Sequence, residues 1–254
     1  MTSPPDVPTV DVAPFDLGEP GAAAALCLHG LTGTPYEVRP LGEALAAVGV
    51  RAVGPALPGH NETPAQLAKL PYTAWVEAAR ANLLSLRERH DAVFVVGLSL
   101  GGLLGLLLAA EERVDGLVVV GTPLQLPRAA RWLAPILKHG FPFLRKRGGS
   151  DIRDDAARLR HPGYPVMPLA SVHELILLQR RVRRALPRVI APILVAHGLR
   201  DGTANPDDAR AILAGVGSQE REILWFEDSA HVVPVDHGGA RLAQEVARHL
   251  SRLA

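Results

Sequence analysis

The stretch HDAVFVVGLSLGGLLGLLLAA, from His90 to Ala110, decides how the chain folds. Its residues are almost all apolar, yet Ser99 stands in the middle, with Gly97 and Gly101 two residues to either side. One interpretation is a buried or membrane-spanning helix in which the serine hydroxyl bonds to a carbonyl one turn back. The other is a sharp turn from a strand into a helix, which exposes Ser99 at the edge of a sheet. The rest of the chain decides between them.

The composition of the chain describes one globular domain. A chain of 254 residues fits one domain, or one domain with an insertion. Its formal net charge is only +1, so we expect no nucleic-acid partner. Cys27 is the only cysteine, which excludes an internal disulfide bond. It lies in the apolar run AAAALCLHG (22–30), where we interpret it as a small hydrophobic residue of a buried strand and not as a nucleophile.

The first residues and the apolar runs bear on where the protein is located. Residues 1–21, MTSPPDVPTVDVAPFDLGEPG, contain neither a basic region nor an apolar core, so we expect no signal peptide. The longest apolar run is the one around Ser99, and it falls short of the roughly 18 residues that a membrane helix needs. We therefore expect a cytoplasmic protein without stable membrane insertion.

Short apolar runs alternate along the chain with patterns that are typical of helices. This alternation predicts an α/β fold with a mostly parallel central sheet and helices on both of its faces. We expect strands at 22–30, 50–57, 92–99, 114–123, 191–198 and 221–229, and helices at 35–49, 72–90, 100–112 and 238–253.

The segment from Pro123 to Arg188 interrupts this alternation. It contains no convincing strand, and it is too long for a simple connection in a compact domain. We interpret residues 123–188 as an inserted helical cap, and we call them the cap segment. They contain fourteen Arg and Lys residues against four Asp and Glu residues, so the segment is strongly basic.

The surroundings of Ser99 favour the strand-to-helix turn. A predicted strand, VFVVGLS, leads directly into a predicted helix, which is the context of a nucleophile elbow. Glycines two residues to either side leave room where the chain doubles back. The start of the helix favours a developing negative charge. Ser99 is therefore the candidate nucleophile.

A serine hydroxyl is a weak nucleophile and needs a general base, which in this kind of site follows the acid in the chain. Ten histidines compete for this position. His231 directly follows the predicted strand at 221–229, at the sheet edge where Ser99 is expected. His197 also follows a strand, but it precedes the candidate acid. We therefore take His231 as the base.

The acid is expected after the preceding strand. Asp201 lies there, in the turn HGLRDGTANP (197–206). Asp207 and Asp208 fit the capping of a helix better. Asp228 lies too close in sequence to His231 to be its partner.

Two backbone N–H groups complete the expected site. The loop after the first parallel strand, in LCLHGLTGTP, places the N–H of Leu31 toward a developing oxyanion. The N–H of Leu100, directly after the nucleophile, is its partner. Because both donors belong to the backbone, the leucine side chains only help to exclude water.

Five motifs together resemble the signature set of the α/β-hydrolase superfamily: LHGLTGTP (28–35), PALPGHN (55–61), GLSLGG (97–102), HGLRDGTANP (197–206) and DSAHVVPVD (228–236). More narrowly, they resemble bacterial carboxylesterases of the monoacylglycerol-lipase-like type. The resemblance extends from about Ala22 to the end of the chain and is least informative in the cap segment. It implies Ser99 as nucleophile, Asp201 as acid, His231 as base, and Leu31 with Leu100 as oxyanion donors. One departure is the short N-terminus, which reduces the two leading strands of the full fold to TVDVAPFDL (9–17).

From these features we expect one α/β-hydrolase domain over residues 1–254 that acts as a serine carboxylesterase on short- to medium-chain acyl esters or monoacylglycerols. A thioesterase, an amidase or a lactonase would use the same triad, and a ligand-binding protein would keep the fold without turnover. No metal or cofactor is implied, because the spacings typical of metal ligands are absent. The expected partner is a small-molecule ester, and we expect a monomer or a homodimer.

The cap segment is rich in apolar residues between Arg128 and Lys146. It follows a strand that ends beside Ser99, so we expect part of its apolar face to line an acyl pocket. Trp132, Phe141 and Phe143 are the candidate pocket residues, although packing of the cap on the core is the alternative for each of them.

Overall fold

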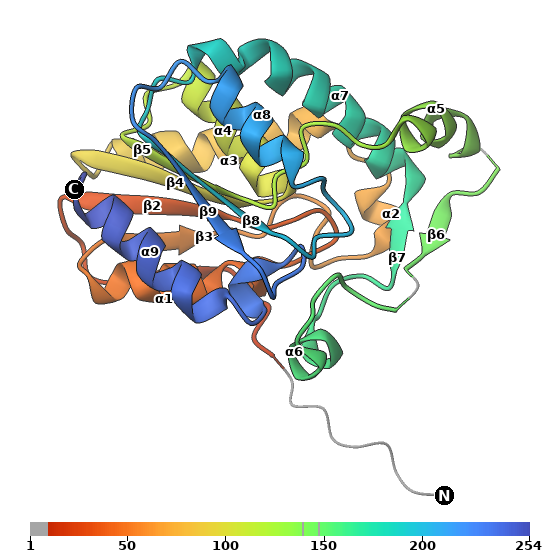
Figure 1. Ribbon diagram of the computed structural model, residues 1–254, viewed down its shortest axis with the longest axis horizontal. Coiled ribbons are helices and arrows are strands. Elements are labelled where there is room, and N and C mark those ends of the chain that lie inside the picture. The colour runs from red at the N-terminus through yellow and green to blue at the C-terminus, as the bar shows by residue number, and fades with distance from the viewer. Residues whose placement is uncertain (1–9, 139, 147) are drawn as a thin grey trace, which may run out of the picture.

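The computed structural model describes residues 10–138, 140–146 and 148–254. The strands are β1 (Phe15–Leu17), β2 (Ala23–Leu28), β3 (Arg51–Gly54), β4 (Ala92–Leu98), β5 (Gly116–Val120), β6 (Phe143–Arg145), β7 (Val166–Pro168), β8 (Ile193–Gly198) and β9 (Arg221–Phe226). Seven of them form a central sheet in the order β1-β3-β2-β4-β5-β8-β9 (Figure 1). β1 pairs antiparallel with β3, and the other neighbours in this sheet pair parallel.

Helices cover both faces of this sheet. They are α1 (Arg39–Ala47), α2 (Pro64–Leu67), α3 (Tyr72–Arg87), α4 (Leu100–Glu111), α5 (Arg128–Leu137), α6 (Asp155–Arg160), α7 (Leu169–Ala185), α8 (Asp207–Gly215) and α9 (Gly239–Ser251), with 3-10 turns η1 (Pro35–Glu37), η2 (Leu186–Arg188) and η3 (Val233–Val235). In Figure 1, α3, α4, α7 and α8 lie above the sheet, and α1 and α9 lie below it. A separate hydrophobic core fills each side. The predicted α/β class is confirmed, and each expected parallel strand and helix is present.

The apolar stretch around Ser99 consists of a strand and a helix that are both buried. β4 lies at the centre of the sheet, between β2 and β5. α4 packs on β4 and β5 with one side and against α3 and α7 with the other. Because neighbours surround α4, its residues from Leu100 to Ala109 are all buried, which explains a helix without a polar face.

The leading part of the fold is short, as the sequence predicts. In the described part of the chain, β1 is the only strand before β2. It covers the end of the predicted segment 9–17, of which residue 9 lies outside the described residues. This strand forms one edge of the sheet, and β3 and β2 separate it from β4.

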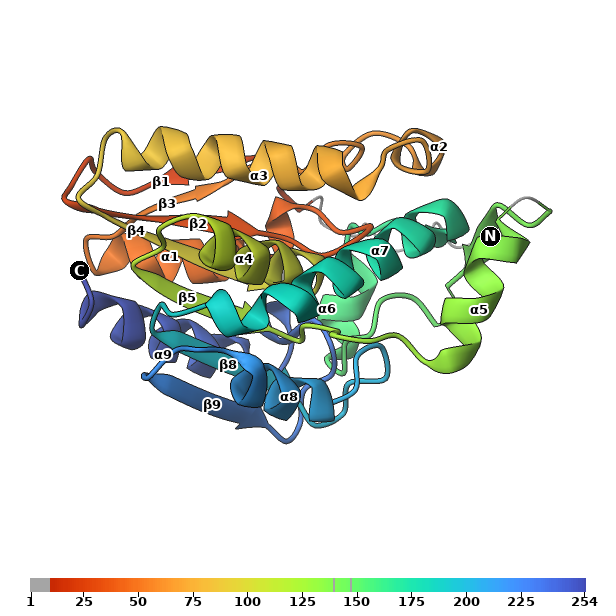
Figure 2. The ribbon, with the colours of Figure 1, turned by 90° about the horizontal axis from the view of Figure 1, so that it is seen from above.

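The cap segment differs from the sequence prediction in two respects. It contains two short strands, β6 and β7, which pair antiparallel with Leu144 opposite Met167. Three-residue strands give too short an alternation to be distinguished from loop in a sequence. The C-terminal part of the segment is also not separate from the rest of the domain, because Leu175, Leu178 and Val182 of α7 belong to the main core above the sheet. Figure 2 shows α5 and α6 beyond the ends of the central strands.

Candidate active site

Ser99 occupies the tight turn between β4 and α4. Its backbone has a φ of 53° and a ψ of −109°, a conformation that residues other than glycine rarely adopt and that costs about 1–3 kcal/mol. A Cβ at Gly97 would lie 2.2 Å from the carbonyl oxygen of Gly101. A Cβ at Gly101 would lie 2.0 Å from the carbonyl oxygen of Leu28. The two glycines therefore permit the turn, and the interpretation of residues 90–110 as one continuous helix is excluded.

A cavity of about 770 Å³ lies over this turn, and both Ser99 and His231 line it. His231 lies in the loop after β9, against Gly121, where an added Cβ would be 3.3 Å from the imidazole Nδ1. Gly121 directly follows Val120, whose carbonyl accepts a hydrogen bond from the N–H of Ser99 at 2.8 Å. In the described part of the chain, the Ser99 hydroxyl makes no hydrogen bond to His231. In free enzymes such bonds are often long and tighten only when substrate binds.

Asp201 lies in the turn after β8 and contacts the imidazole ring of His231. Its Oδ2 lies 2.8 Å from Nδ1 of His231, and its Oδ1 accepts hydrogen bonds from the N–H groups of Thr203 and Ala204 at 2.8 and 2.7 Å. The carboxylate is fully buried. Burial alone would raise its pKa, but the charge of His231 and these hydrogen bonds outweigh burial and lower the pKa below its usual range. Burial likewise opposes protonation of His231, but Asp201 outweighs it and raises the pKa of the imidazole.

A second histidine contacts the same carboxylate. Nε2 of His197 lies 3.0 Å from Oδ2 of Asp201, and the ring is fully buried at the end of β8. His197, the other candidate base, does not line the cavity that Ser99 and His231 line. The four-residue spacing between His197 and Asp201 is visible in the sequence, but outside a helix this spacing does not predict contact.

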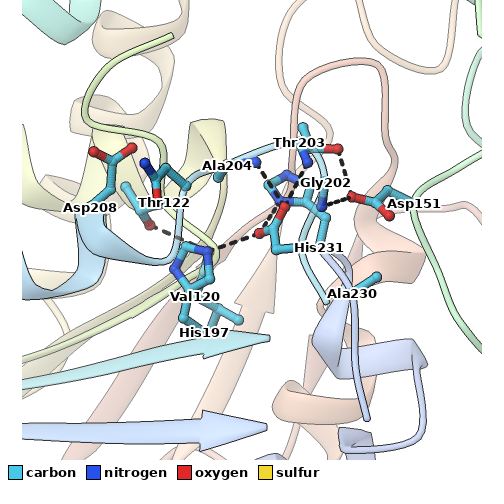
Figure 3. Close-up of polar contacts among 12 residues, drawn as sticks. Val120, Thr122, Asp151, His197, Gly202, Thr203, Ala204, Asp208, Ala230 and His231 are labelled. Carbon is cyan, nitrogen blue, oxygen red and sulfur yellow. Dashed lines mark hydrogen bonds and ion pairs between the residues drawn. The ribbon is translucent and has the colours of Figure 1, made fainter. Parts of the chain in front are cut away.

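Asp151 of the cap segment holds the turn that carries Asp201. Its Oδ2 accepts hydrogen bonds from the N–H of Gly202 and the hydroxyl of Thr203, both at 2.9 Å (Figure 3). Its carbonyl oxygen accepts a hydrogen bond from the N–H of His231 at 3.1 Å. The cap segment therefore contacts both His231 and the turn of Asp201, and the sequence carries no pattern that reveals this.

The loop after β2, residues 29–34, presents the N–H of Leu31, and we call it the oxyanion loop. The carbonyl of Gly30 accepts hydrogen bonds from Nδ1–H of His29 at 2.9 Å and from the N–H of Gly33 at 3.1 Å. The proton of His29 is on Nδ1 because Nε2 accepts from the N–H of Leu57 at 3.1 Å. In a trans peptide the N–H points away from the carbonyl. These hydrogen bonds therefore fix the N–H of Leu31, which points in the direction opposite to the Gly30 carbonyl.

Leu31 and Leu100 have the properties that their predicted role requires. Within the described residues, neither N–H donates a hydrogen bond to another part of the chain. Leu31 and Gly30 line the cavity. Leu100 does not line it, but its N–H belongs to the peptide bond that directly follows Ser99, at the start of α4.

The predicted pocket residues of the cap are not in the cavity wall. Trp132 and Phe141 are 74% and 65% exposed, and Phe143 is 40% exposed. The apolar wall is formed instead by neighbours of these residues, namely Leu126, Ala129, Ala130, Leu133, Ala134, Leu137, Leu144, Met167, Leu169 and Val172. Trp132 lies on the other side of α5 from these cavity residues, and Phe143 alternates with Leu144 along β6. Sequence spacing gave the right segment but not the face that it turns to the cavity.

Polar side chains also line the cavity, and the sequence did not predict them. Glu37, Lys146, Ser150 and His161 lie there together with Asp151. Lys146 donates a hydrogen bond to the Thr32 hydroxyl at 2.6 Å, and its burial lowers its pKa. Four of these five residues come from the cap segment, and Lys146 among them contacts the oxyanion loop although it lies more than 100 residues away in sequence.

Two further properties concern the described residues as a whole. No three His, Cys, Asp or Glu side chains among them gather in a way that would hold a metal ion. None of the helices described is long and apolar enough to cross a membrane.

Comparison with known proteins assigns the chain to a family. The family model described as serine aminopeptidase, S33, matches residues 19–237. The chain is 31% identical over 221 residues to the thermostable monoacylglycerol lipase of Bacillus sp. (strain H-257), which covers 86% of each chain. It is 25% identical over 234 residues to the carboxylesterase of Bacillus subtilis (strain 168), covering 92% of this chain and 94% of that one.

A solved structure gives the same result. A chain from the study of LipS and LipT, two metagenome-derived lipolytic enzymes, superposes with a TM-score of 0.88 at 30% identity, over 96% of this chain and 98% of that one. The resemblance that the five sequence motifs indicated is confirmed. The chain belongs to the serine aminopeptidase S33 family and has the α/β-hydrolase fold.

Proposed function

We propose that the chain is a serine hydrolase that cleaves carboxylic esters, with Ser99 as nucleophile, His231 as base and Asp201 as the orienting acid. One observation carries the proposal. A serine in a strained turn lines the same cavity as a histidine whose far nitrogen is held by a buried, ionised carboxylate. The relatives named monoacylglycerol lipase and carboxylesterase support ester hydrolysis.

The geometry supports a two-step mechanism through an acyl-enzyme. Asp201 holds the proton of His231 on Nδ1, so Nε2 accepts the proton of Ser99 as its oxygen attacks the ester carbonyl. The N–H groups of Leu31 and Leu100 stabilise the tetrahedral oxyanion. His231 then protonates the departing alcohol. A water molecule, activated by His231, releases the acid in the second step.

The polar and apolar residues that line the cavity suggest which parts of an ester it accepts. The apolar wall formed by α5, β6, β7 and α7 suits an acyl chain. The polar lining residues suit a hydroxylated alcohol, and glycerol esters such as monoacylglycerols have both an acyl chain and such an alcohol. The cavity volume of about 770 Å³ matches a short- to medium-chain acyl ester. We further expect the enzyme in the cytoplasm as a monomer or homodimer, with residues 123–188 as its cap.

An assay of the purified protein tests the proposed function. We expect hydrolysis of p-nitrophenyl butyrate and of a monoacylglycerol, and negligible cleavage of amino-acid p-nitroanilides. Ser99→Ala is expected to lower kcat/KM for the esters by about 10⁴-fold or more, because the triad acts as a unit. The exposed Ser251→Ala serves as the matched control. Parent-like ester turnover by folded Ser99→Ala protein, or faster cleavage of anilides than of esters, would contradict the proposal.

The pair formed by Asp201 and His231 predicts a pH profile. His231 must be neutral to accept a proton, and Asp201 raises its pKa above 6.5, so activity is expected to rise with pH through an apparent pKa above that value. The stability that the raised pKa provides changes in the opposite direction. It is complete below pH 6.5 and is lost as the pH rises through the raised pKa.

The same substitution at two aspartates tests the identity of the acid. Asp201→Asn is expected to lower kcat by roughly 10³–10⁴-fold, because the amide no longer fixes the imidazole tautomer. The exposed Asp228→Asn is expected to remain within about twofold of the parent. Initial rates of both variants on one ester, across pH 5 to 9, decide between the carboxylates. A larger loss of activity in Asp228→Asn than in Asp201→Asn would show that Asp201 is not the acid.

The face of α5 that lines the cavity predicts which substitutions change acyl preference. Ala130→Phe fills part of the apolar wall, so we expect kcat/KM for a laurate ester to fall at least about tenfold relative to a butyrate ester. Trp132→Ala, on the exposed face of the same helix, is the control, and its ratio is expected to equal that of the parent. A shift in Trp132→Ala together with an unchanged ratio in Ala130→Phe would place the acyl chain elsewhere.

A further inference from the structure

Glu37 is a buried carboxylate beneath the oxyanion loop. Its side chain is only 5% exposed, and its Oε2 accepts a hydrogen bond from the N–H of Gly30 at 2.8 Å. A Cβ at Gly33 would lie 2.2 Å from Oε1 and Oε2, so the loop closes directly over the carboxylate. Burial alone would raise the pKa of Glu37, but His161 and the Gly30 N–H outweigh it and lower the pKa to about 2. Glu37 is therefore ionised at any pH where the triad is active.

His161 of the cap segment holds the other oxygen of this carboxylate. Its Nε2 lies 3.0 Å from Oε1 of Glu37, and its ring is only 2% exposed. The N–H of Gly163 donates to Nδ1 at 3.2 Å, and the hydroxyl of Ser150 lies 2.8 Å from the same nitrogen. Nδ1 is thus an acceptor, so the proton is on Nε2 and is donated to Glu37. Both oxygens of Glu37 thus accept hydrogen bonds from the protein itself.

The two peptides of the oxyanion loop are held by different groups. His29 and Gly33 fix the carbonyl of the peptide that carries the N–H of Leu31. Glu37 fixes the preceding peptide through the N–H of Gly30. Because Gly30 has no side chain to restrict its backbone, the hydrogen bonds on both sides of its α-carbon, from Glu37 and from His29 and Gly33, together hold the turn that carries the N–H of Leu31.

The cap segment reaches the oxyanion loop at two further points. Lys146 donates to the Thr32 hydroxyl at 2.6 Å, and the N–H of Tyr164 donates to the Thr32 carbonyl at 2.9 Å. Thr32 has a φ of 65°, so the loop is held in a conformation that it would not adopt freely.

We propose that Glu37 is a positioning residue for the oxyanion hole, and that His161 couples it to the cap segment. Glu37 holds the Gly30 peptide so that the N–H of Leu31 points at the developing oxyanion, and His161 holds Glu37. The cap segment would then contribute to the rate of the chemical step as well as to acyl preference. This inference rests on the proposed function, since it assigns a role within that reaction.

Three variants separate positioning from simple structural support. Glu37→Ala is expected to lower kcat for p-nitrophenyl butyrate at least tenfold, although less than the 10²–10³-fold typical of losing an oxyanion donor, with KM within about twofold. Glu37→Gln is expected to fall between Glu37→Ala and the parent, because its amide oxygen still accepts from Gly30. His161→Ala is expected to lower kcat in the same way, and the exposed Glu43→Gln is the control with parent kinetics.

A transition-state analogue gives the readout that a structural role would not change. An alkyl trifluoromethyl ketone forms a hemiketal whose oxyanion occupies the oxyanion hole, so its Ki is expected to rise by the same factor as kcat falls in each variant. Binding of the product carboxylic acid is expected to stay unchanged. If Glu37→Ala does not fold, Glu37→Gln and His161→Ala carry the same comparison.

Two results would overturn the inference. In the first, folded Glu37 and His161 variants keep parent kcat and parent Ki and differ only in thermal stability. In the second, KM rises while kcat is unchanged, which would make Glu37 a substrate-binding residue. If the parent protein binds the ketone but hydrolyses no ester, the proposed function fails while the Ki comparison still tests the positioning of the loop.

Discussion

The close passage of α4 beneath the end of β4 is the constraint on which the rest of the structure depends. It requires Gly97 and Gly101, because a Cβ at either position would lie within 2.2 Å of a backbone oxygen. It forces Ser99 into the left-handed region, and the cost of that conformation is carried by a helix and a strand that are buried along almost their whole length. Serine is thereby presented to a cavity although its neighbours belong to the core.

Two buried carboxylates act on this site in the same physical way. Asp201 holds Nδ1 of His231, the candidate base, and Glu37 accepts a hydrogen bond from the N–H of Gly30, next to the predicted oxyanion donor Leu31. Each is ionised because its hydrogen-bond partners outweigh the cost of burial. Each is also tied to the cap segment, since Asp151 holds the turn of Asp201 and His161 holds Glu37. The cap segment therefore belongs to the same network of contacts as the candidate catalytic residues.

The parts of the site that follow strand ends were predictable from the sequence. Ser99, Asp201 and His231 each follow an apolar strand, and the carboxyl ends of parallel strands meet at one edge of the sheet. The contact between Glu37 and His161 joins residues 124 positions apart, and no local pattern records such a contact. The position of Trp132 and Phe143 outside the cavity lining has a related cause. Apolar spacing identifies a helix or strand, but which face meets a cavity depends on how the whole cap segment is placed.

Labelling with a fluorophosphonate tests most directly whether Ser99 is the activated nucleophile. The reagent reacts with a serine only where a base and an oxyanion hole assist the attack. After digestion and mass spectrometry, we expect a single stoichiometric adduct on the peptide that contains Ser99, and loss of labelling when the protein carries His231→Ala. An adduct on another residue, or no adduct on folded protein that hydrolyses esters, would contradict this assignment of the active site.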